Sequence, residues 1–245
     1  MPIVAADLVA YNCVNRPTNE TATGGGAIDL KVRPTFTQLA ADDDTEYVST
    51  STLDTQSSTV NGRSATGANV QEVLTLTGAT VKTGTQVFER ILDQLLVSGA
   101  IGTVTFRRQP AGATIFTIVP PERGCSALFK RSASESGIAI RYDKTFWRNA
   151  HATLTLSAAT VMLTADPDAR IRQGVHTAKG DSVSIANRKA APAGVTFVDD
   201  NVSQAVPTNA LAAGENIGVW WEQNLPASDP AHKTTFTSQL AGTTI

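Results

Sequence analysis

The chain has 245 residues and a formal net charge of −2, and only 17% of its residues are charged, against roughly 25% in ordinary soluble domains. This balance excludes the basic surface by which proteins bind nucleic acid, and no apolar run approaches the ~20 residues of a membrane-spanning helix. The length allows one large β domain or two of about 100–130 residues each.

The first half of the chain reads as short strands separated by polar turns. The clearest is 70–78, in which Leu74 and Leu76 fall on one face and Val73 falls on the other. This period of two, closed by Gly78, is typical of a half-buried antiparallel strand. The other strands expected in this half are also short and end at turn residues: 3–14, 28–32, 46–50, 55–61, 102–108 and 113–119.

Three stretches punctuate this half. Residues 80–96 carry some apolar residues at helical spacing, but polarity alternates at their start, so we expect a strand rather than a short helix. Asn61-Gly62 is expected to form a turn, because both residue types tolerate positive φ. Residues 119–124, Val-Pro-Pro-Glu-Arg-Gly, are the best candidate for a linker or a crossing between sheets.

The second half continues the same pattern. Its expected strands are 125–130, 138–147, 153–163, 171–178, 182–187, 195–198 and 216–224. Strands at this spacing, punctuated by Pro and Gly, predict an all-β fold of antiparallel β-sandwich or jelly-roll type. We expect two packed domains, an N-terminal β-sandwich over 1–120 and a C-terminal β-sandwich over 121–245.

We expect no catalytic, cofactor-binding or metal site. His151, His176 and His232 are scattered and lack a second ligand at metal spacing, although a Ser-His-Asp triad is open to any sequence rich in Ser and Asp. The run 42–44, Asp-Asp-Asp, lacks the rest of a calcium-binding loop and is expected to be a solvated tip, with a weak cation site as the alternative. The two cysteines, Cys13 and Cys125, are expected to be buried free thiols, with a disulfide as the alternative.

The residues expected at an interface come from two places. Adjacent residues in a strand face opposite sides, so one of Trp220 and Trp221 should enter the core while the other looks outward, to contact a partner or stack on a sugar. Gly24, Gly25 and Gly26 close a polar stretch, 15–26, that is expected to be either a flexible arm across a neighbouring subunit or an ordinary surface loop. The arginines 141, 170 and 172 are expected to form ion pairs rather than a phosphate site.

Several segments resemble virion structural proteins of tailed bacteriophages. Residues 57–63 are similar to a strand and turn of those proteins, and 73–78 followed by 83–91 is similar to their hairpin. Further along, 140–149 resembles another of their strands, and 211–220 followed by 225–227 resembles their C-terminal segment. These motifs encode hairpins rather than a site, so the resemblance implies a virion component without fixing its position.

The resemblance implies a non-enzymatic protein, and we expect a capsid decoration (cement) protein that stabilises the head through protein–protein contacts. The alternatives are a neck, tail or baseplate component, or a carbohydrate- or receptor-binding module. The expected partners are other virion proteins and further copies of the chain in a homo-oligomer, with no nucleic acid and no membrane. The N-terminus has no signal-peptide pattern, so we expect assembly in the host cytoplasm and residence in the virion. Because Thr (33 residues) outnumbers Lys and Arg together (20), apolar burial and neutral hydrogen bonds should dominate its contacts.

Overall fold

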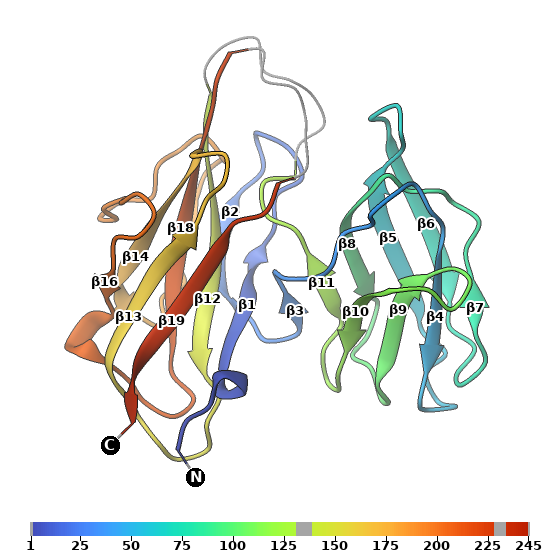
Figure 1. Cartoon of the computed structure of the whole chain (residues 1–245), viewed down its shortest axis with the longest axis horizontal. Helices are drawn as coiled ribbons and strands as arrows, with labels where there is room; N and C mark the ends of the chain where they lie inside the picture. The colour runs from blue at the N-terminus through green and yellow to red at the C-terminus, as the bar shows by residue number, and fades with distance from the viewer. Residues whose placement is uncertain (1, 131–138, 228–233, 245) are drawn as a thin grey trace. The chain divides into compact units, whose positions relative to one another are not determined.

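The structure is a computed structural model that describes residues 2–130, 139–227 and 234–244. Strands make up its regular structure, and two short 3₁₀ turns, η1 (Ala5–Asp7) and η2 (Pro207–Asn209), are the only helical segments in the described ranges (Figure 1). Neither turn is long and apolar enough to cross a membrane. The expected all-β class is therefore confirmed.

The contacts of the chain divide it into two compact units, and in the sequence one unit interrupts the other. Unit 2 is Leu30–Ser132, and unit 1 combines Met1–Asp29 with Ala133–Ile245. This differs from the expected split near residue 120. The reason lies in the pairing of the N-terminal strand β1 (Leu8–Asn15), which is hydrogen-bonded to β12 (Ala139–Asn149) more than a hundred residues later.

Unit 1 contains a six-stranded antiparallel sheet, which holds both β1 and β12. In spatial order its strands are β14 (Ile171–Lys179), β18 (Asn216–Leu225), β12, β1, β2 (Gly24–Asp29) and β15 (Ser184–Ile185). The pair β12–β18 is the longest ladder, and its register places Lys144 opposite Trp220 and Asp143 opposite Trp221.

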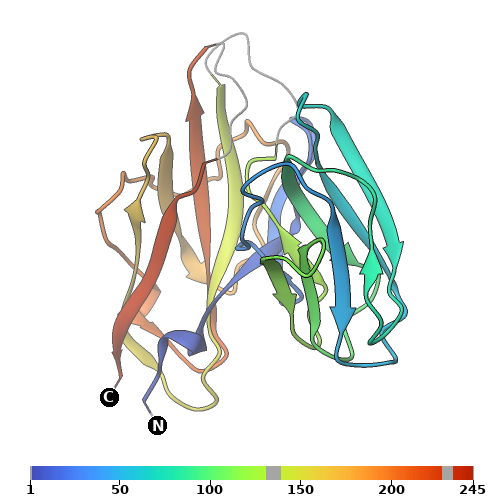
Figure 2. The same ribbon diagram turned by 45° about the vertical axis from the view of Figure 1, so that its right-hand side comes forward.

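A second sheet in unit 1 is organised around β13 (Leu156–Ala165), which pairs with three partners, β16 (Gln204–Ala205), β17 (Ala210–Leu211) and β19 (Thr237–Thr244). The strand β19 runs beside β13 in both views (Figures 1 and 2). No strand was expected over 237–244, because its residues are mostly small and polar. The expected strand 195–198 is wrong, since only Val198 forms a bridge there, to Gln173.

Unit 2 also contains two sheets. One has the order β10 (Thr114–Ile118), β9 (Val104–Arg108), β4 (Thr45–Ser49), β7 (Lys82–Thr83), and the other has the order β3 (Val32–Arg33), β11 (Gly124–Ser126), β8 (Arg90–Leu96), β5 (Ser57–Arg63), β6 (Asn69–Thr75). Adjacent strands in these two sheets run antiparallel, apart from β3 and β11, which are parallel. Buried side chains of both sheets form one core, in which the rings of Tyr47 and Phe106 stack with centroids 4.8 Å apart.

Three expectations for unit 2 have clear outcomes. Residues 82–83 and 90–96 are strands, so the strand reading of 80–96 is confirmed over the helix. The turn expected at Asn61-Gly62 is wrong, because both residues lie inside β5, where the register shifts by a bulge. Residues 119–124, expected to be a linker or a crossing between sheets, cross from β10 in one sheet to β11 in the other inside unit 2, and the buried Glu122 pairs there with Arg33 at 2.6 Å.

Candidate functional site

A buried amine beside a buried carboxyl group marks the most unusual chemistry in unit 1. Lys144 lies in the middle of β12, and its side chain is fully buried. Its Nζ atom is 4.6 Å from the centre of the Phe146 ring and 5.3 Å from that of the Trp220 ring. A cation in so apolar a place requires several hydrogen-bond acceptors to offset the loss of hydration.

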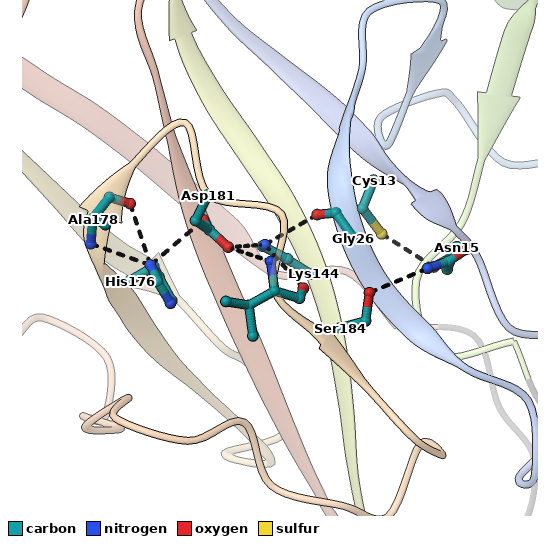
Figure 3. A network of polar contacts seen from close by, with 9 residues as sticks. Cys13, Asn15, Gly26, Lys144, His176, Ala178, Asp181 and Ser184 are labelled. Carbon is teal, nitrogen blue, oxygen red and sulfur yellow. Dashed lines mark hydrogen bonds and ion pairs between the residues drawn. The ribbon is translucent and has the colours of Figure 1, made fainter.

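Three acceptors surround this amine (Figure 3). Nζ donates to the carbonyl oxygen of Gly26 at 3.1 Å, to that of Val183 at 3.3 Å and to Oδ1 of Asp181. Asp181 lies between β14 and β15 and is only 4% exposed. Its Oδ1 also accepts the backbone N–H of Val183 at 3.0 Å. One carboxylate oxygen is thus held by two donors.

The other oxygen, Asp181 Oδ2, faces His176 of β14. Oδ2 has no hydrogen-bond partner among the described residues, and His176 Nδ1 lies 3.6 Å from it. Nδ1 lies 3.1 Å from the backbone nitrogen of Ala178 and 3.2 Å from its carbonyl oxygen, so it accepts from the N–H in one tautomer and donates to the carbonyl in the other. In the tautomer without a proton on Nδ1, two lone pairs face each other across the 3.6 Å contact with Oδ2.

Burial shifts the pKa values of the Lys144 amine and of the nearby Cys13 thiol. It lowers the pKa of Lys144 below its usual value, against the opposing effect of the hydrogen bond and charge of Asp181. Burial likewise raises the pKa of Cys13 to about 12, with the charge of Asp143 as the next cause. The Cys13 thiol is therefore neutral, and its Sγ donates to the carbonyl oxygen of Asn15 at 3.1 Å. The network thus places an amine whose charged form is disfavoured by burial beside a carboxyl group with one oxygen left without a donor.

A second polar cluster of the same sheet consists of ion pairs. Glu222 accepts from the Tyr142 hydroxyl at 3.1 Å and from Arg172 at 3.0 Å. Arg141, whose side chain is 1% exposed, pairs with Glu20 at 2.7 Å. The expectation that Arg141 and Arg172 form ion pairs is confirmed. Both arginines already have carboxylate partners, so their role is to stabilise the packing around this sheet.

Both Trp220 and Trp221 are buried, at 0% and 2% exposure, so the expectation that one looks outward is wrong. The face that carries Trp220 is covered by apolar residues between β15 and β16, including Val195 and Phe197. On the other face Trp221 packs against Phe236, with ring centroids 4.8 Å apart, and donates from Nε1 to Thr145. Neither ring is available to stack on a sugar or anchor a partner.

Gly24, Gly25 and Gly26 form the first half of β2 rather than a flexible connection, and all three are buried. Their lack of side chains is required by packing: a Cβ atom on Gly25, where φ is +82°, would meet the Trp220 ring at 2.6 Å. The segment before them is tied to the sheet through Glu20 and through Arg16, which pairs with Asp29 at 2.9 Å. The arm expected over 15–26 is therefore wrong.

The other candidates have simple outcomes. Cys13 and Cys125 are buried free thiols, as expected. The side chain of His151 accepts two backbone N–H groups of its own turn, from Thr153 and Leu154, and His232 lies outside the described residues. In the run 42–44, Asp43 pairs with Arg108. Within the described ranges no group of three His, Cys, Asp or Glu residues is arranged to hold a metal ion.

One end of unit 2 carries a feature that the sequence pattern did not indicate. Four apolar side chains stand exposed on three connections at the same end of its sheets, and we call this set the apolar loop end: Leu53 (67% exposed), Val97 (64%), Ile101 (57%) and Val119 (41%). The connections are 50–56, 97–103 and 119–123. Their charged residues are Asp54, Glu122 and Arg123, and none of the three is exposed.

Asp54 holds these connections together from inside. Its Oδ1 accepts the backbone N–H of Ile101 and its Oδ2 that of Gly102, both at 2.9 Å, while Ser49 Oγ donates to Oδ2 at 2.5 Å. The backbone N–H of Ala100 donates to the carbonyl oxygen of Glu122 at 2.9 Å, which attaches the third connection. The apolar loop end is therefore held in place by buried polar contacts.

The Lys144 network and the apolar loop end were both missed from the sequence. A signal for the first was present, since strand alternation places Lys144 on the same face as the aromatic residues Tyr142 and Phe146. Its partner Asp181 has no comparable signal, because only the sheet brings the two together. No protein-family profile, curated protein or solved structure matches this chain.

Proposed function

We propose that the protein is a non-enzymatic structural protein of a tailed-bacteriophage virion, a capsid decoration (cement) protein that binds the head shell. In the same proposal, each unit is an antiparallel β-sandwich of jelly-roll type. The protein acts as a homo-oligomer, is made in the host cytoplasm and stays on the virion. The observation that carries this proposal is the apolar loop end of unit 2.

The chemistry of that loop end fits a protein–protein contact. The four side chains of this set are apolar, and of the charged residues on its connections Asp54 and Glu122 are buried and Arg123 is only partly exposed. The centres of protein interfaces are depleted of charged residues in this way. The contacts of Asp54 and Ala100 fix the loops before binding, so docking loses little conformational entropy.

The rest of the molecule supports a scaffold role. Ionisable side chains inside the sheets pair with one another, as Arg141 does with Glu20 and Arg107 with Glu46. The resemblance of several hairpins to phage virion proteins points to the same class of protein. The carbohydrate-binding alternative loses its basis, because both tryptophans that suggested it are buried.

The test is co-sedimentation with phage heads that lack this protein. The wild-type chain should pellet with heads, while the double variant Leu53→Ser/Ile101→Ser should remain in the supernatant. Val73→Ser is the matched control, because Val73 is also exposed (58%) but lies within the strand β6 and not on one of these connections. This control should pellet like the wild type.

Two results would contradict the proposal. Binding of the double variant equal to that of the wild type would remove the loop end from the contact. Binding to purified tails instead of heads would replace the cement role with the neck, tail or baseplate alternative.

A further inference from the structure

We propose that the side-chain amine of Lys144 and the carboxyl group of Asp181 condense to an intramolecular amide bond inside unit 1. The pair starts as an ammonium and a carboxylate, and one proton passes from Nζ to the carboxyl group. The Nζ lone pair then forms a bond to Cγ while the bond from Cγ to Oδ2 breaks. Oδ2 leaves as water with two of the ammonium protons, and the amide keeps the third. No oxidant or other reactant is required.

The surroundings favour the uncharged pair that this reaction needs. Lys144 is fully buried between the rings of Phe146 and Trp220, and burial disfavours an ammonium ion. On the acid side, His176 Nδ1 lies 3.6 Å from Oδ2. When Nδ1 carries no proton and accepts from the Ala178 N–H, a proton that moves from Nζ to Oδ2 converts the contact with His176 from repulsion to attraction.

The two oxygens of Asp181 are in different environments that suit different roles. Oδ1 accepts the backbone N–H of Val183 at 3.0 Å, and such a donor stabilises the negative charge that develops on a carbonyl oxygen under attack. Oδ2 is without a hydrogen-bond donor among the described residues and faces His176, which can return a proton to it as it leaves. Oδ1 therefore becomes the amide oxygen and Oδ2 the water.

The side chains of Lys144 and Asp181 are tightly packed and shielded from solvent. A Cβ atom on Gly218 would meet Asp181 Oδ2 at 2.4 Å and Lys144 Cε at 2.8 Å, so only glycine leaves room for both groups. The side chains of Lys144, Asp181 and His176 are 0%, 4% and 9% exposed. Bulk water is thus kept from the bond once it has formed, and the amide N–H retains the carbonyl oxygens of Gly26 and Val183 as acceptors.

Unit 2 provides an internal comparison, the buried ion pair between Lys130 and Asp93 at 3.0 Å. There the second oxygen of Asp93 accepts from Asn61 at 2.6 Å, and Lys130 Nζ donates to Ser126 Oγ at 2.9 Å. Both carboxylate oxygens of Asp93 accept a hydrogen bond, so neither is left without a donor as Asp181 Oδ2 is. One amide bond is therefore expected in the chain, not two.

The test is the mass of the denatured full-length chain. The expected value is about 18 Da below the mass of the unmodified sequence, since one water is lost. Proteolysis should then yield a branched product in which the peptide containing Lys144 is joined to the one containing Asp181. A chain at full mass, or a deficit that maps elsewhere, would overturn the proposal, and this measurement depends on no variant.

Substitutions of Lys144, Asp181 and His176 then test the role of each residue in the reaction. Lys144→Arg and Asp181→Ala should restore the full mass, whereas the control Lys130→Arg should keep the deficit. Asp181→Asn should lose ammonia instead of water, about 17 Da. In a time course of freshly synthesised chain, His176→Gln should slow the appearance of the linked form at least about tenfold, in line with general acid–base catalysis. An unchanged rate would overturn the role of His176.

Discussion

The Cη2 atom of Trp220 lies 2.6 Å from the position that a Cβ atom on Gly25 would occupy, closer than side-chain carbons approach in proteins. The two residues belong to different strands of the six-stranded sheet, β18 and β2. Trp220, the largest side chain that is fully buried, therefore packs over a strand that has no side chains at that point.

Gly25→Ala is expected to destabilise unit 1 by about 2 to 5 kcal/mol, the sum of a strained positive φ and of overpacking against Trp220. The three tryptophans of the chain, Trp147, Trp220 and Trp221, all belong to unit 1. Urea unfolding followed by tryptophan fluorescence therefore measures this unit.

The matched control is Gly180→Ala. Gly180 also has a positive φ, +62°, but nothing lies within 4 Å of the position that a Cβ atom would take there. Its cost should be roughly 1 kcal/mol, from backbone strain alone. Equal losses at the two positions would mean that contact with Trp220 contributes nothing.

Asp54 should make the stability of unit 2 depend on acid pH. Burial alone would raise the pKa of Asp54, but hydrogen bonds from Ser49, Ile101, Gln56 and Gly102 together hold it below the usual value. The stabilisation is thus complete above the unfolded pKa of about 3.9 and is lost as the pH falls through the lower, folded pKa.

Asp54→Ala should remove this dependence and cost unit 2 about 2 to 4 kcal/mol, because it leaves several buried donors without an acceptor. Hydrogen exchange of the amides of Ile101 and Gly102 as a function of pH measures the effect. Asp42→Ala is the control, since Asp42 is exposed in the same unit; its effect should stay within about 0.5 kcal/mol. Loss of the acid dependence in the control as well would refute the assignment to Asp54.

The cysteines should be inert in the native protein. Burial is the main cause that raises the pKa of Cys13 to about 12 and that of Cys125 well above its usual value. Since the thiolate is the reactive form, iodoacetamide at a pH of about 8 should label neither residue until denaturant is added, after which both react. Mass spectrometry counts the labels, and rapid labelling of either cysteine without denaturant would contradict the buried positions.

Attachment to the head should depend weakly on ionic strength. On the connections of the apolar loop end Asp54 and Glu122 are buried and Arg123 is only partly exposed, so screening by salt has little effect on this contact. Raising NaCl from low concentration to about 1 M, where the screening length is only a few ångströms, should leave the protein bound in the co-sedimentation assay. Release by salt would show that charged residues outside this loop end carry the contact.

The strands themselves could be predicted from the sequence because polarity alternates within each of them. In 70–78 the expected faces are correct: Leu74 and Leu76 are buried, and Val73 is 58% exposed. The strand β19 could not be predicted in the same way, since Leu240 is its only buried residue. Its place in the sheet comes from its pairing with β13. The alternation of residues within 237–244 does not indicate this pairing.

The long-range contacts that create the candidate sites also could not be predicted from the local sequence pattern. Alternation assigns Trp220 and Trp221 to opposite faces, which is correct, but it does not reveal that residues 183–197 cover one face and Phe236 the other. For the same reason Lys144 could be noticed as a cation on the same strand face as the aromatic residues Tyr142 and Phe146, while its contact with Asp181 is created only by the folding of distant segments.

The insertion of unit 2 also sets the order in which the chain can fold during synthesis. Residues 30–132 hold all the strands of unit 2, so that unit can fold once they have left the ribosome. The strands β1 and β2 emerge first but must wait for β12, which begins roughly 110 residues after β2 ends, a delay on the order of 5 to 20 s at ordinary rates of translation. During that interval the glycine-rich strand has no Trp220 above it and few apolar side chains of its own, and so offers little surface for premature association with other nascent chains.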